Sequence, residues 1–425
     1  MAGIGWGEEK MKKDFQGLVM ETREGQNWEL WQGDCLEVLR SLPTGSVHCC
    51  VTSPPYWGLR DYGLPPSVWD GAPECDHDWQ EDSCTRCGAW RGQLGLEPSV
   101  DRYVAHLVQV FREVRRALRD DGTLWLNLGD SYAGSWGNYS PRMKGPSENW
   151  KPGRIRRTAY EDRSWRPANS LPQKGLKTKD LIGVPWRVAL SLQADGWYLR
   201  SDIVWEKPNC MPESVRDRPT RSHEYVFLLS KSERYYYDAE AIGEPVTSES
   251  AARLGRRWQG NTLRGYRSGA RQNHFDRYMG SERAKGQTRR NRRTVWHIPS
   301  KSFRGAHFAV FPPALVEPCL LAGTSERGCC PVCGAPWRRT GGEEKPQTGD
   351  GWKATCSCSG RETARCRILD PFTGSGTTGV VALEKGRRFL GIEMKPDYCS
   401  MAEGRLREAT IQAAQTSLDF PAGVQ

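Results

Sequence analysis

The chain has 425 residues, which is enough to bury a sizeable core as one large domain with insertions or as two domains. Its 61 Lys and Arg residues exceed its 51 Asp and Glu residues, and the net charge of +10 favours a polyanionic partner, with a merely basic soluble protein as the alternative. No stretch approaches the roughly 18 apolar residues of a membrane span, and residues 1–16 lack the apolar run of a secretion signal, so we expect a cytoplasmic protein.

The N-terminal part alternates short strands with helices. Apolar residues recur at helical spacing in some segments, while the segments between them are short, apolar and bounded by turn residues. Strands at this spacing around helices predict an α/β fold with a mainly parallel sheet. In chain order we predict a strand over 28–34, a helix over 35–43, a strand over 46–52, a helix over 100–119 that Asp120-Asp121-Gly122 ends, and a strand over 123–130.

Two basic stretches interrupt the middle of the chain. Residues 135–178 are rich in Gly, Pro, Ser, Lys and Arg without sustained periodicity, and we interpret them as a long loop. The second stretch holds thirteen Lys or Arg residues between Arg253 and Arg293. Basic segments of this density suit contact with the phosphates of a nucleic acid, and a solvated loop is the alternative interpretation. Between the two stretches we predict a helix over 181–194 and strands over 196–207 and 223–231.

A glycine-rich turn near the C-terminus predicts a nucleotide-binding unit. Gly374, Gly376 and Gly379 follow a predicted strand over 367–369 and open a helix, so backbone amides can approach a ligand. The next strand ends at Glu393, whose carboxylate can accept hydrogen bonds from both hydroxyls of a ribose. This pattern fits a dinucleotide or S-adenosylmethionine, and it is no P-loop because no Gly-Lys-Ser/Thr follows. A last helix is predicted from Pro396 to Ala414.

Asp370, immediately before this turn, favours S-adenosylmethionine over NAD. A carboxylate at the tip of the strand can hold the ammonium group of S-adenosylmethionine, whereas it would repel a pyrophosphate. The sequence therefore predicts an S-adenosylmethionine site.

A second segment, Ser53-Pro54-Pro55-Tyr56, ends the strand over 46–52 abruptly. Suppose that the methyl acceptor is the amino group of a nucleobase. This amine is a poor nucleophile because its lone pair is delocalised into the ring, so a site that activates it must accept hydrogen bonds from it. The Ser53 hydroxyl and the Pro54 carbonyl are suitable acceptors, and Tyr56 offers a face for a base turned out of a duplex. Taken alone, the segment also fits a proline-rich turn with aromatic residues packed on it.

Together the two segments resemble the β class of DNA amino-methyltransferases, which methylate cytosine N4 or adenine N6. In that family the catalytic tetrapeptide precedes the target-recognition region, which precedes the cofactor turn, and this chain has the same order. The resemblance implies a Rossmann-like, S-adenosylmethionine-dependent methyltransferase fold and double-stranded DNA as the partner. It also implies a prokaryotic or phage source, and it leaves a cognate restriction endonuclease and a homodimer open as partners.

The resemblance assigns parts of the chain to functions. Residues 25–240 would form a catalytic half with a basic loop at 135–178, residues 241–295 a target-recognition region, and residues 296–415 a cofactor-binding half. The family pattern does not explain two cysteine-bearing insertions, at 71–95 in the first half and at 326–362 in the second, which we predict to bind zinc. The catalytic residues are Ser53, Pro54, Pro55 and Tyr56. The cofactor-binding residues are Asp34, His307, Phe308, Pro312, Asp370, Pro371, Phe372, Gly374, Ser375, Gly376, Thr377, Thr378 and Glu393.

The first residue of the tetrapeptide bears on the target base. Serine is commoner there in cytosine-N4 enzymes, so the resemblance favours N4-methylcytosine and keeps adenine N6 as the alternative. Cytosine-C5 chemistry needs a nucleophilic Cys after a Pro, but Pro318-Cys319 lies in an apolar run that predicts a buried thiol. An RNA amino-methyltransferase and a zinc-bearing DNA-binding protein without catalysis are more remote alternatives.

Fifteen cysteines in a reducing compartment indicate metal ligands or core residues rather than disulfides. Two pairs have the CxxCG form, and each has further potential ligands nearby, so we predict two structural sites for tetrahedral zinc. Cys329 is an alternative to Cys330. Zinc in the first site would rigidify the insertion beside the DNA cleft, and its removal would weaken DNA binding. The predicted ligands are Cys75, His77, Cys84 and Cys87 in the first site and Cys330, Cys333, Cys356 and Cys358 in the second.

Overall fold

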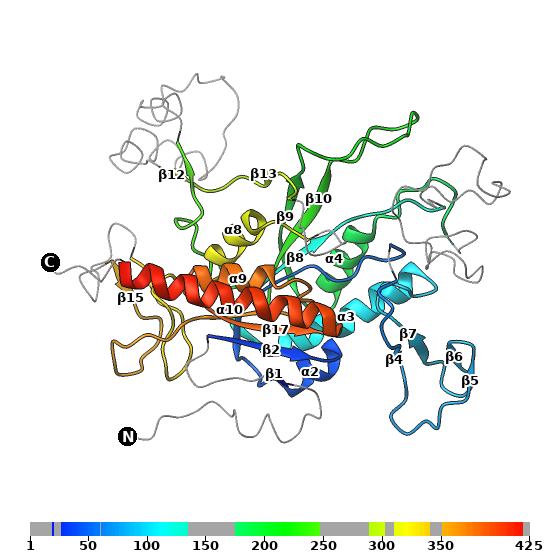
Figure 1. The fold of residues 1–425 in the computed structure, drawn as a ribbon, viewed down its shortest axis with the longest axis horizontal. Helices are drawn as coiled ribbons and strands as arrows, with labels where there is room; N and C mark the ends of the chain where they lie inside the picture. Colours follow the sequence, from blue (N-terminus) through cyan, green and yellow to red (C-terminus); the bar gives the residue numbers. More distant parts are fainter. Residues whose placement is uncertain are drawn as a thin grey trace, which may run out of the picture.

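The computed structural model describes residues 19–20, 27–59, 61–134, 175–246, 289–301, 310–340 and 351–419. A nine-stranded sheet crosses the molecule in the order β1-β2-β17-β16-β3-β8-β10-β9-β13 (Figure 1). His307 and Phe308, most of the predicted basic loop at 135–178 and residues 247–288 of the predicted target-recognition region lie outside the described residues.

Five neighbouring strands of this sheet run parallel, which confirms the predicted α/β fold with a mainly parallel sheet. The parallel strands are β2 (Trp28–Gln32), β17 (Arg388–Glu393), β16 (Arg367–Asp370), β3 (Val47–Thr52) and β8 (Leu118–Leu128). The remaining strands extend both edges: β1 (Val19–Met20) is antiparallel to β2, β10 (His223–Ser230) is antiparallel to both β8 and β9 (Tyr198–Glu206), and β13 (Val295–His297) is parallel to β9.

Both faces of the sheet are apolar, since successive strand residues point to opposite faces, and in the described residues three helices cover each of them. Along β8, for example, Leu124 and Leu126 belong to one core and Trp125 to the other. The first core also takes in α2 (Cys35–Ser41), α3 (Val100–Ala117) and α4 (Val184–Ala194). The second takes in α8 (Pro313–Gly323), α9 (Thr377–Glu384) and α10 (Pro396–Asp419). Cys319 is 1% exposed in α8, as expected for a core thiol.

One predicted boundary is wrong. Asp120-Asp121-Gly122 was expected to end the helix before a strand at 123, but α3 ends at Ala117 and β8 begins at Leu118. The early start comes from pairing with β3, because Val47 is the partner of Leu118 and the register then shifts before Cys49 pairs with Thr123. Tertiary pairing thus overrides the local turn signal.

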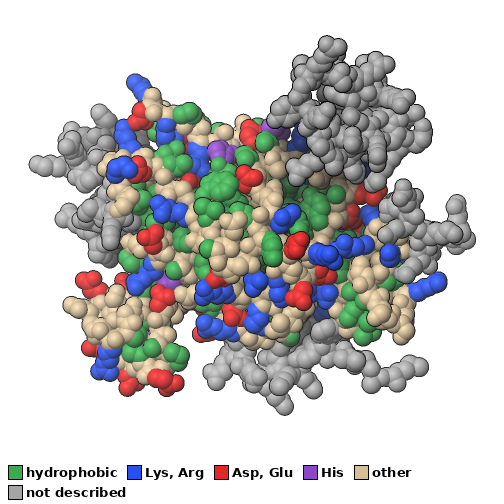
Figure 2. All heavy atoms as spheres, turned by 180° about the vertical axis from the view of Figure 1, so that it is seen from behind, with side chains coloured by type: hydrophobic (Ala, Val, Ile, Leu, Met, Phe, Trp, Pro, Cys, Tyr) green, Lys and Arg blue, Asp and Glu red, His purple; other side chains and the backbone are tan. Residues whose placement is uncertain are grey.

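A small sheet between β3 and α3 carries the first cysteine cluster. Its order is β4-β7-β6-β5, built from β4 (Ser67–Trp69), β5 (Trp79–Gln80), β6 (Ser83–Cys84) and β7 (Trp90–Gly92). In Figure 2 this insertion projects from the body at the lower left. Its exposed carboxylates are Glu74, Asp76, Asp78, Glu81 and Asp82.

Two further pairs of two-residue strands complete the fold in the described residues. β11 (Glu244–Pro245) pairs with β12 (Arg289–Arg290), and β14 (Arg338–Arg339) pairs with β15 (Trp352–Lys353). Among the helices of the described ranges, none is both long and apolar enough to cross a membrane.

Candidate active site

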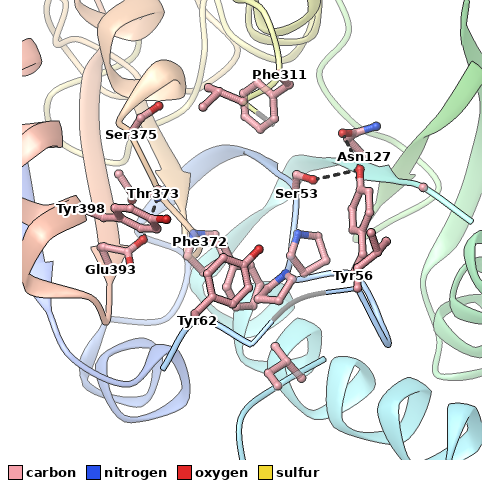
Figure 3. A pocket seen from close by; sticks show the side chains of 18 of the residues that line it. Ser53, Tyr56, Tyr62, Asn127, Phe311, Phe372, Thr373, Ser375, Glu393 and Tyr398 are labelled. Atoms are coloured by element: carbon pink, nitrogen blue, oxygen red, sulfur yellow. Dashed lines mark hydrogen bonds between the residues drawn. The ribbon is translucent and has the colours of Figure 1, made fainter. Parts of the chain in front are cut away.

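A cavity of about 540 Å³ opens at the carboxyl ends of the parallel strands. In Figure 3, Ser53, Tyr56 and Asn127 lie on one side of it, and Glu393, Thr373 and Ser375 lie on the other. Parallel strands end at the same edge of a sheet, so segments more than 300 residues apart in the chain meet here. The predicted site residues that line the cavity are Asp34, Ser53, Pro54, Pro55, Tyr56, Pro371, Phe372, Gly374, Ser375, Thr377 and Glu393.

The tetrapeptide loop offers one unused carbonyl to the cavity. The Pro55 carbonyl accepts a hydrogen bond from the Tyr103 hydroxyl of α3 at 2.7 Å. The Pro54 carbonyl has no hydrogen-bond partner within the described ranges, and Pro54 lines the cavity. The Pro54 carbonyl is therefore available as an acceptor, the role that the sequence predicts for it, while Pro55 anchors the loop to α3.

Trp57 and Glu97 help to hold this loop in place. Trp57 is 1% exposed, and its Nε1 donates to the Glu97 carbonyl at 3.0 Å. Gly58 N donates to the Gly95 carbonyl at 2.8 Å, and the Glu97 carboxylate accepts from Gly95 N at 2.8 Å. Burial raises the pKa of Glu97, against the hydrogen bond from His106 that lowers it.

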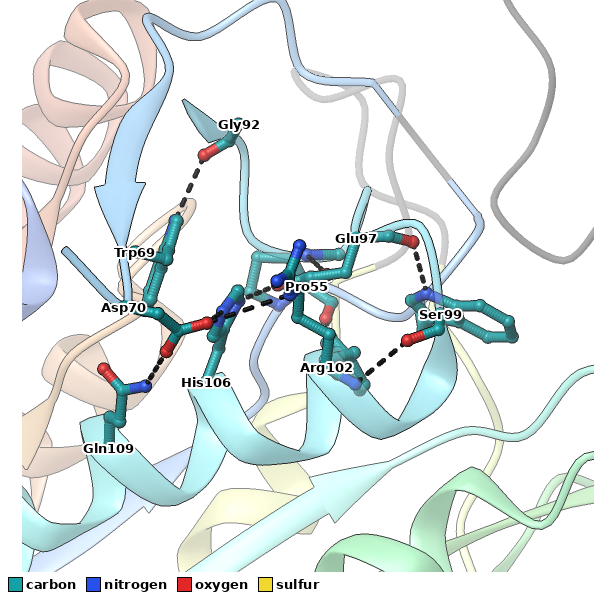
Figure 4. Close-up of polar contacts among 12 residues, drawn as sticks. Pro55, Trp69, Asp70, Gly92, Glu97, Ser99, Arg102, His106 and Gln109 are labelled. Atoms are coloured by element: carbon teal, nitrogen blue, oxygen red, sulfur yellow. Dashed lines mark hydrogen bonds and ion pairs between the residues drawn. The ribbon is translucent and has the colours of Figure 1, made fainter. Parts of the chain in front are cut away.

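His106 joins the loop support to the cysteine-bearing insertion. Its ring is completely buried, with Nδ1 3.0 Å from Glu97 Oε1 and Nε2 3.0 Å from Asp70 Oδ2 (Figure 4). It stacks on Trp69 of β4 and Trp90 of β7, at centroid distances of 4.5 and 5.5 Å. The first cysteine insertion and the tetrapeptide loop thus share one buried network.

Tyr56 is the centre of a hydrogen-bond network on the catalytic side. Its hydroxyl lies 3.3 Å from Ser53 Oγ, 3.1 Å from Asn127 Oδ1 and 2.8 Å from Glu224 Oε2. Glu224 also pairs with Lys207, whose ammonium lies 4.2 Å from the centre of the Trp205 ring. Sequence reasoning missed Asn127, Glu224 and Lys207, although a polar Asn inside an apolar strand was a usable signal.

Glu393 shapes the cofactor side. Its two carboxylate oxygens accept hydrogen bonds from Gly374 N and Lys395 N, both at 2.8 Å, and each oxygen keeps a lone pair for a ligand hydroxyl. Burial raises its pKa, against these backbone hydrogen bonds that lower it. Gly376, with φ of +81°, caps α9, and a Cβ there would lie 3.1 Å from Ala402 of α10. Glycine is therefore required for both the turn and the packing.

Four other predicted cofactor residues either make structural hydrogen bonds or do not line the cavity. Asp34 lines the cavity, but its carboxylate caps α2, accepting from Leu36 N at 2.8 Å, and also accepts from the Ser67 hydroxyl at 2.6 Å. Pro312 is the N-terminal cap residue of α8. Neither it nor Gly376 nor Thr378 lines the cavity.

The structure does not bring the Asp370 side chain to the cavity. It is completely buried and accepts hydrogen bonds from Thr52 Oγ1 at 2.7 Å, Thr378 Oγ1 at 2.8 Å and Phe372 N at 3.1 Å. These partners come from β3, α9 and the turn, so the carboxylate holds three parts of the site together. Direct contact with the ammonium group of a cofactor was expected from sequence, and the observed position does not provide it.

Replacing Asp370 with asparagine is expected to remove part of the pH dependence of stability. Burial raises the pKa of Asp370 from 3.8 to about 6, against the hydrogen bonds from Thr52 and Thr378. The folded protein thus binds this proton more tightly than the unfolded chain does. The protonated carboxyl therefore adds about 3 kcal/mol to the free energy of unfolding below about pH 4, and this contribution is lost as the pH rises through about 6. Urea unfolding should show that the free energy of unfolding of the variant rises relative to that of wild type as the pH is raised over that range.

The same variant separates the two roles of Asp370. An amide oxygen can still accept from Thr52 and Phe372 N, and the Thr378 hydroxyl, 3.3 Å from the Val51 carbonyl, can turn its proton there and accept from the amide. We therefore expect cofactor affinity within about twofold of wild type by calorimetric titration. A loss of about a hundredfold would instead support direct pairing with an ammonium group. Asp370→Leu, which removes every acceptor, is the destabilised comparison.

The predicted metal ligands form two clusters in which the ligand atoms lie within 4.8 Å of one another. Both CxxCG turns have the same backbone geometry. Cys84 N donates to the Ala89 carbonyl and Cys330 N to the Ala335 carbonyl, each at 2.8 Å. The glycines that follow the pairs, Gly88 and Gly334, have φ values of +74° and +73°. The clusters are Cys75, His77, Cys84 and Cys87, and Cys330, Cys333, Cys356 and Cys358.

The second cluster lies at the end of the sheet opposite the cavity. His48, near the start of β3, hydrogen-bonds the Gly334 carbonyl through Nε2 at 2.9 Å, and Arg119, near the start of β8, donates to the Cys333 carbonyl at 2.7 Å. Cys330, rather than Cys329, joins this cluster. Cys329 lies instead near His48 and Cys366, where His48 Nδ1 accepts from Arg367 N at 3.0 Å. Both nitrogens of His48 are thus engaged, so it is not free to bind a metal.

The chain is similar to known DNA methyltransferases. Residues 47–404 match the model of the N6/N4 methyltransferase family, which is described as DNA methylase. The type II methyltransferase M.Cfr9I of Citrobacter freundii is 41% identical over 379 residues, covering 89% of this chain and 87% of that protein. The type II methyltransferase M.SmaI of Serratia marcescens is 39% identical over 377 residues, covering 88% and 89%.

A solved structure gives a weaker similarity. The PvuII DNA methyltransferase, described as cytosine-N4-specific, is 16% identical, covers 93% of each chain and has a TM-score of 0.47. The family match and the M.Cfr9I similarity confirm the resemblance stated from the tetrapeptide and the glycine turn. The chain therefore belongs to the N6/N4 DNA methylase family and is an S-adenosylmethionine-dependent amino-methyltransferase of DNA.

Proposed function

We propose that this enzyme transfers a methyl group from S-adenosylmethionine to the N4 amine of cytosine in double-stranded DNA. The observation that carries the base assignment is Ser53, a neutral hydroxyl at the catalytic side of the cavity, beside the free carbonyl of Pro54. Adenine N6 remains the alternative, because its amine offers the same hydrogen bonds to these two acceptors.

The cavity residues suit binding of the cofactor on the side opposite Ser53. Glu393 keeps lone pairs for ribose hydroxyls, and Gly374, with φ of +53°, has open space where a side chain would stand. Ser375 and Thr377 line the cavity at the first turn of α9. S-adenosylmethionine supplies an activated methyl group bound to sulfonium. We propose these residues, together with Asp34, Pro371 and Phe372, as the binding surface for it.

The remaining residues present the target base. Tyr56 offers a ring face for a flipped base, and the ring is held from behind by the backbone of Gly129, where a Cβ would lie 2.5 Å from Tyr56 Cε2. Ser53 Oγ and the Pro54 carbonyl accept the two hydrogens of the amine and draw its nitrogen toward tetrahedral geometry. The nitrogen lone pair then attacks the methyl carbon directly, so no covalent enzyme intermediate is needed.

Mass spectrometry of nucleosides tests the base assignment. Double-stranded DNA, single-stranded DNA and RNA are each treated with enzyme and labelled cofactor and digested completely. We expect labelled N4-methylcytosine from double-stranded DNA. N6-methyladenine would overturn the base assignment but not the amino-methyltransferase, and preferential labelling of RNA would overturn DNA as the substrate.

We also propose one structural zinc ion in each cysteine cluster. Each cluster supplies four protein ligands, which leaves no open coordination position for a reacting water. The first site lies in an insertion whose exposed carboxylates, Glu74, Asp76 and Asp78 among them, are unsuited to contact with phosphates. We therefore revise the expected role of this zinc: it supports the tetrapeptide loop through Trp69, Trp90 and His106 rather than binding DNA. A cognate endonuclease and a homodimer stay predictions.

A further inference from the structure

A chain of hydroxyl groups leads from the catalytic loop to a carboxylate on β10. Ser53 Oγ lies 3.3 Å from Tyr56 Oη, which in turn lies 2.8 Å from Glu224 Oε2 (Ser53 and Tyr56 in Figure 3). The other oxygen of that carboxylate pairs with the Lys207 ammonium. All four residues line the cavity. The chain therefore connects the predicted acceptor of the target amine to a charged pair on the neighbouring strands.

Asn127 limits the ways in which these hydroxyls can point. Its Nδ2 donates to the Tyr225 carbonyl at 3.1 Å and to Glu224 Oε2 at 3.2 Å, so its Oδ1, 3.1 Å from Tyr56 Oη, is an acceptor. Tyr56 carries one hydroxyl proton and faces two acceptors, and the nearer of them is Glu224. Of the three side chains that contact Tyr56 Oη, Ser53 is the one that can donate to it.

Because the Ser53 hydroxyl donates its proton to Tyr56, Ser53 Oγ is left as a hydrogen-bond acceptor toward the cavity. Its own proton points to Tyr56, so its lone pairs are free for the target amine. Burial, followed by the negative charge of Glu224, raises the pKa of Tyr56 well above its ordinary value, so the phenol keeps its proton and can act as the donor. The direction of the chain is thus set at its far end, by a carboxylate that can only accept.

We propose that Glu224 is a positioning residue that sets the direction of the Ser53–Tyr56 chain and receives, through it, the proton that the target amine loses. This inference rests on the proposed function, in which Ser53 Oγ accepts a hydrogen bond from that amine. As the bond from nitrogen to the methyl carbon forms, the carbon–sulfur bond breaks and its electron pair stays on sulfur. The excess proton on nitrogen passes to Ser53 Oγ, the Ser53 proton passes to Tyr56 Oη, and the Tyr56 proton passes to Glu224.

Glu224→Gln tests the direction of the chain. The oxygen of the new amide would pair with Lys207 and its NH₂ would face Tyr56, so residue 224 could neither accept the hydrogen bond from Tyr56 nor receive its proton. We expect kcat for transfer of a labelled methyl group to fall about tenfold to a hundredfold, with KM for DNA and cofactor affinity unchanged within about twofold. Glu224→Asp keeps the charge and should recover part of the rate. The matched control is Glu206→Gln on β9, whose carboxylate pairs with His297 outside the cavity at 2.7 Å.

A double-mutant cycle with Tyr56→Phe makes the test independent of fold stability. Phenylalanine keeps the ring for stacking and removes the hydroxyl, so it should slow kcat as much as Glu224→Gln does. The double variant should be no slower than Tyr56→Phe alone, because the loss of the Tyr56 hydroxyl already breaks the path to residue 224. Additive losses, or a wild-type rate for either single variant, would overturn the relay. The assay counts methyl groups on any base, so methylated adenine would refute the cytosine assignment and still leave the cycle decisive.

Discussion

Ser53→Ala is expected to lower kcat for methyl transfer about a hundredfold to a thousandfold, because one of the two acceptors for the target amine is lost where charge develops on its nitrogen. The Pro54 carbonyl remains, so some activity should persist. Cofactor affinity should stay within about twofold, since Ser53 and Glu393 lie on opposite sides of the cavity (Figure 3). Single-turnover transfer of a labelled methyl group and calorimetric titration of the cofactor measure the two effects.

Ser46→Ala is the matched control for this prediction. Ser46 lies just before the other end of the same strand, and its hydroxyl donates to the Pro43 carbonyl at 2.7 Å. It should retain the wild-type kcat. A Ser53→Ala enzyme as fast as wild type would exclude the hydroxyl from the reaction, and a parallel loss of cofactor affinity would assign it to cofactor binding.

The two cysteine clusters are expected to differ in the effect of losing one ligand: the first should affect the rate of the reaction, and the second the stability of the fold. Cys84→Ser should release one zinc ion and lower kcat about tenfold, because Trp69 and Trp90 of this insertion hold His106, which supports the tetrapeptide loop through Glu97. Cys330→Ser should release the other ion and lower the melting temperature by more than about 5 °C while the folded fraction keeps its kcat, since that cluster contacts the far ends of β3 and β8.

The measurements are zinc content by atomic emission, thermal unfolding, and kcat per folded molecule. Cys210→Ser is the control, because Cys210 belongs to none of the possible metal clusters of the described residues. Protein produced with ample zinc but containing none would refute the proposed metal sites. Equal kinetic effects of Cys84→Ser and Cys330→Ser would refute the division of roles between them.

Burial of hydrogen-bonding side chains beneath the insertion is expected to make this part of the molecule sensitive to substitution. Glu97 and His106 are both completely buried, and each is satisfied only by the other and by neighbouring backbone and carboxylate groups. Removing one partner from such a pair leaves the other unsatisfied and is strongly destabilising. The tetrapeptide is thus positioned by a network that has no direct part in the reaction.

The parts of the site that depend on local order could be predicted from the amino-acid sequence. Ser53, Pro54 and Tyr56 follow one parallel strand, Gly374 follows a second and Glu393 ends a third, so the rule that parallel strands end at the same edge was enough to bring them together. The two CxxCG turns were predictable for the same reason, because their ligand spacing and the left-handed glycine are properties of a few consecutive residues.

The groups that face those residues could not be predicted in this way, because they come from strands that pair only in the folded protein. Glu224 and Lys207 reach Tyr56 because β10 and β9 pair antiparallel beside β8, a register that no short segment encodes. Asp370 points away from the cavity because Thr52, 318 positions earlier in the chain, and Thr378 take its carboxylate. Local sequence sets turns, caps and strand ends, whereas the partner of a buried polar group depends on packing between distant segments.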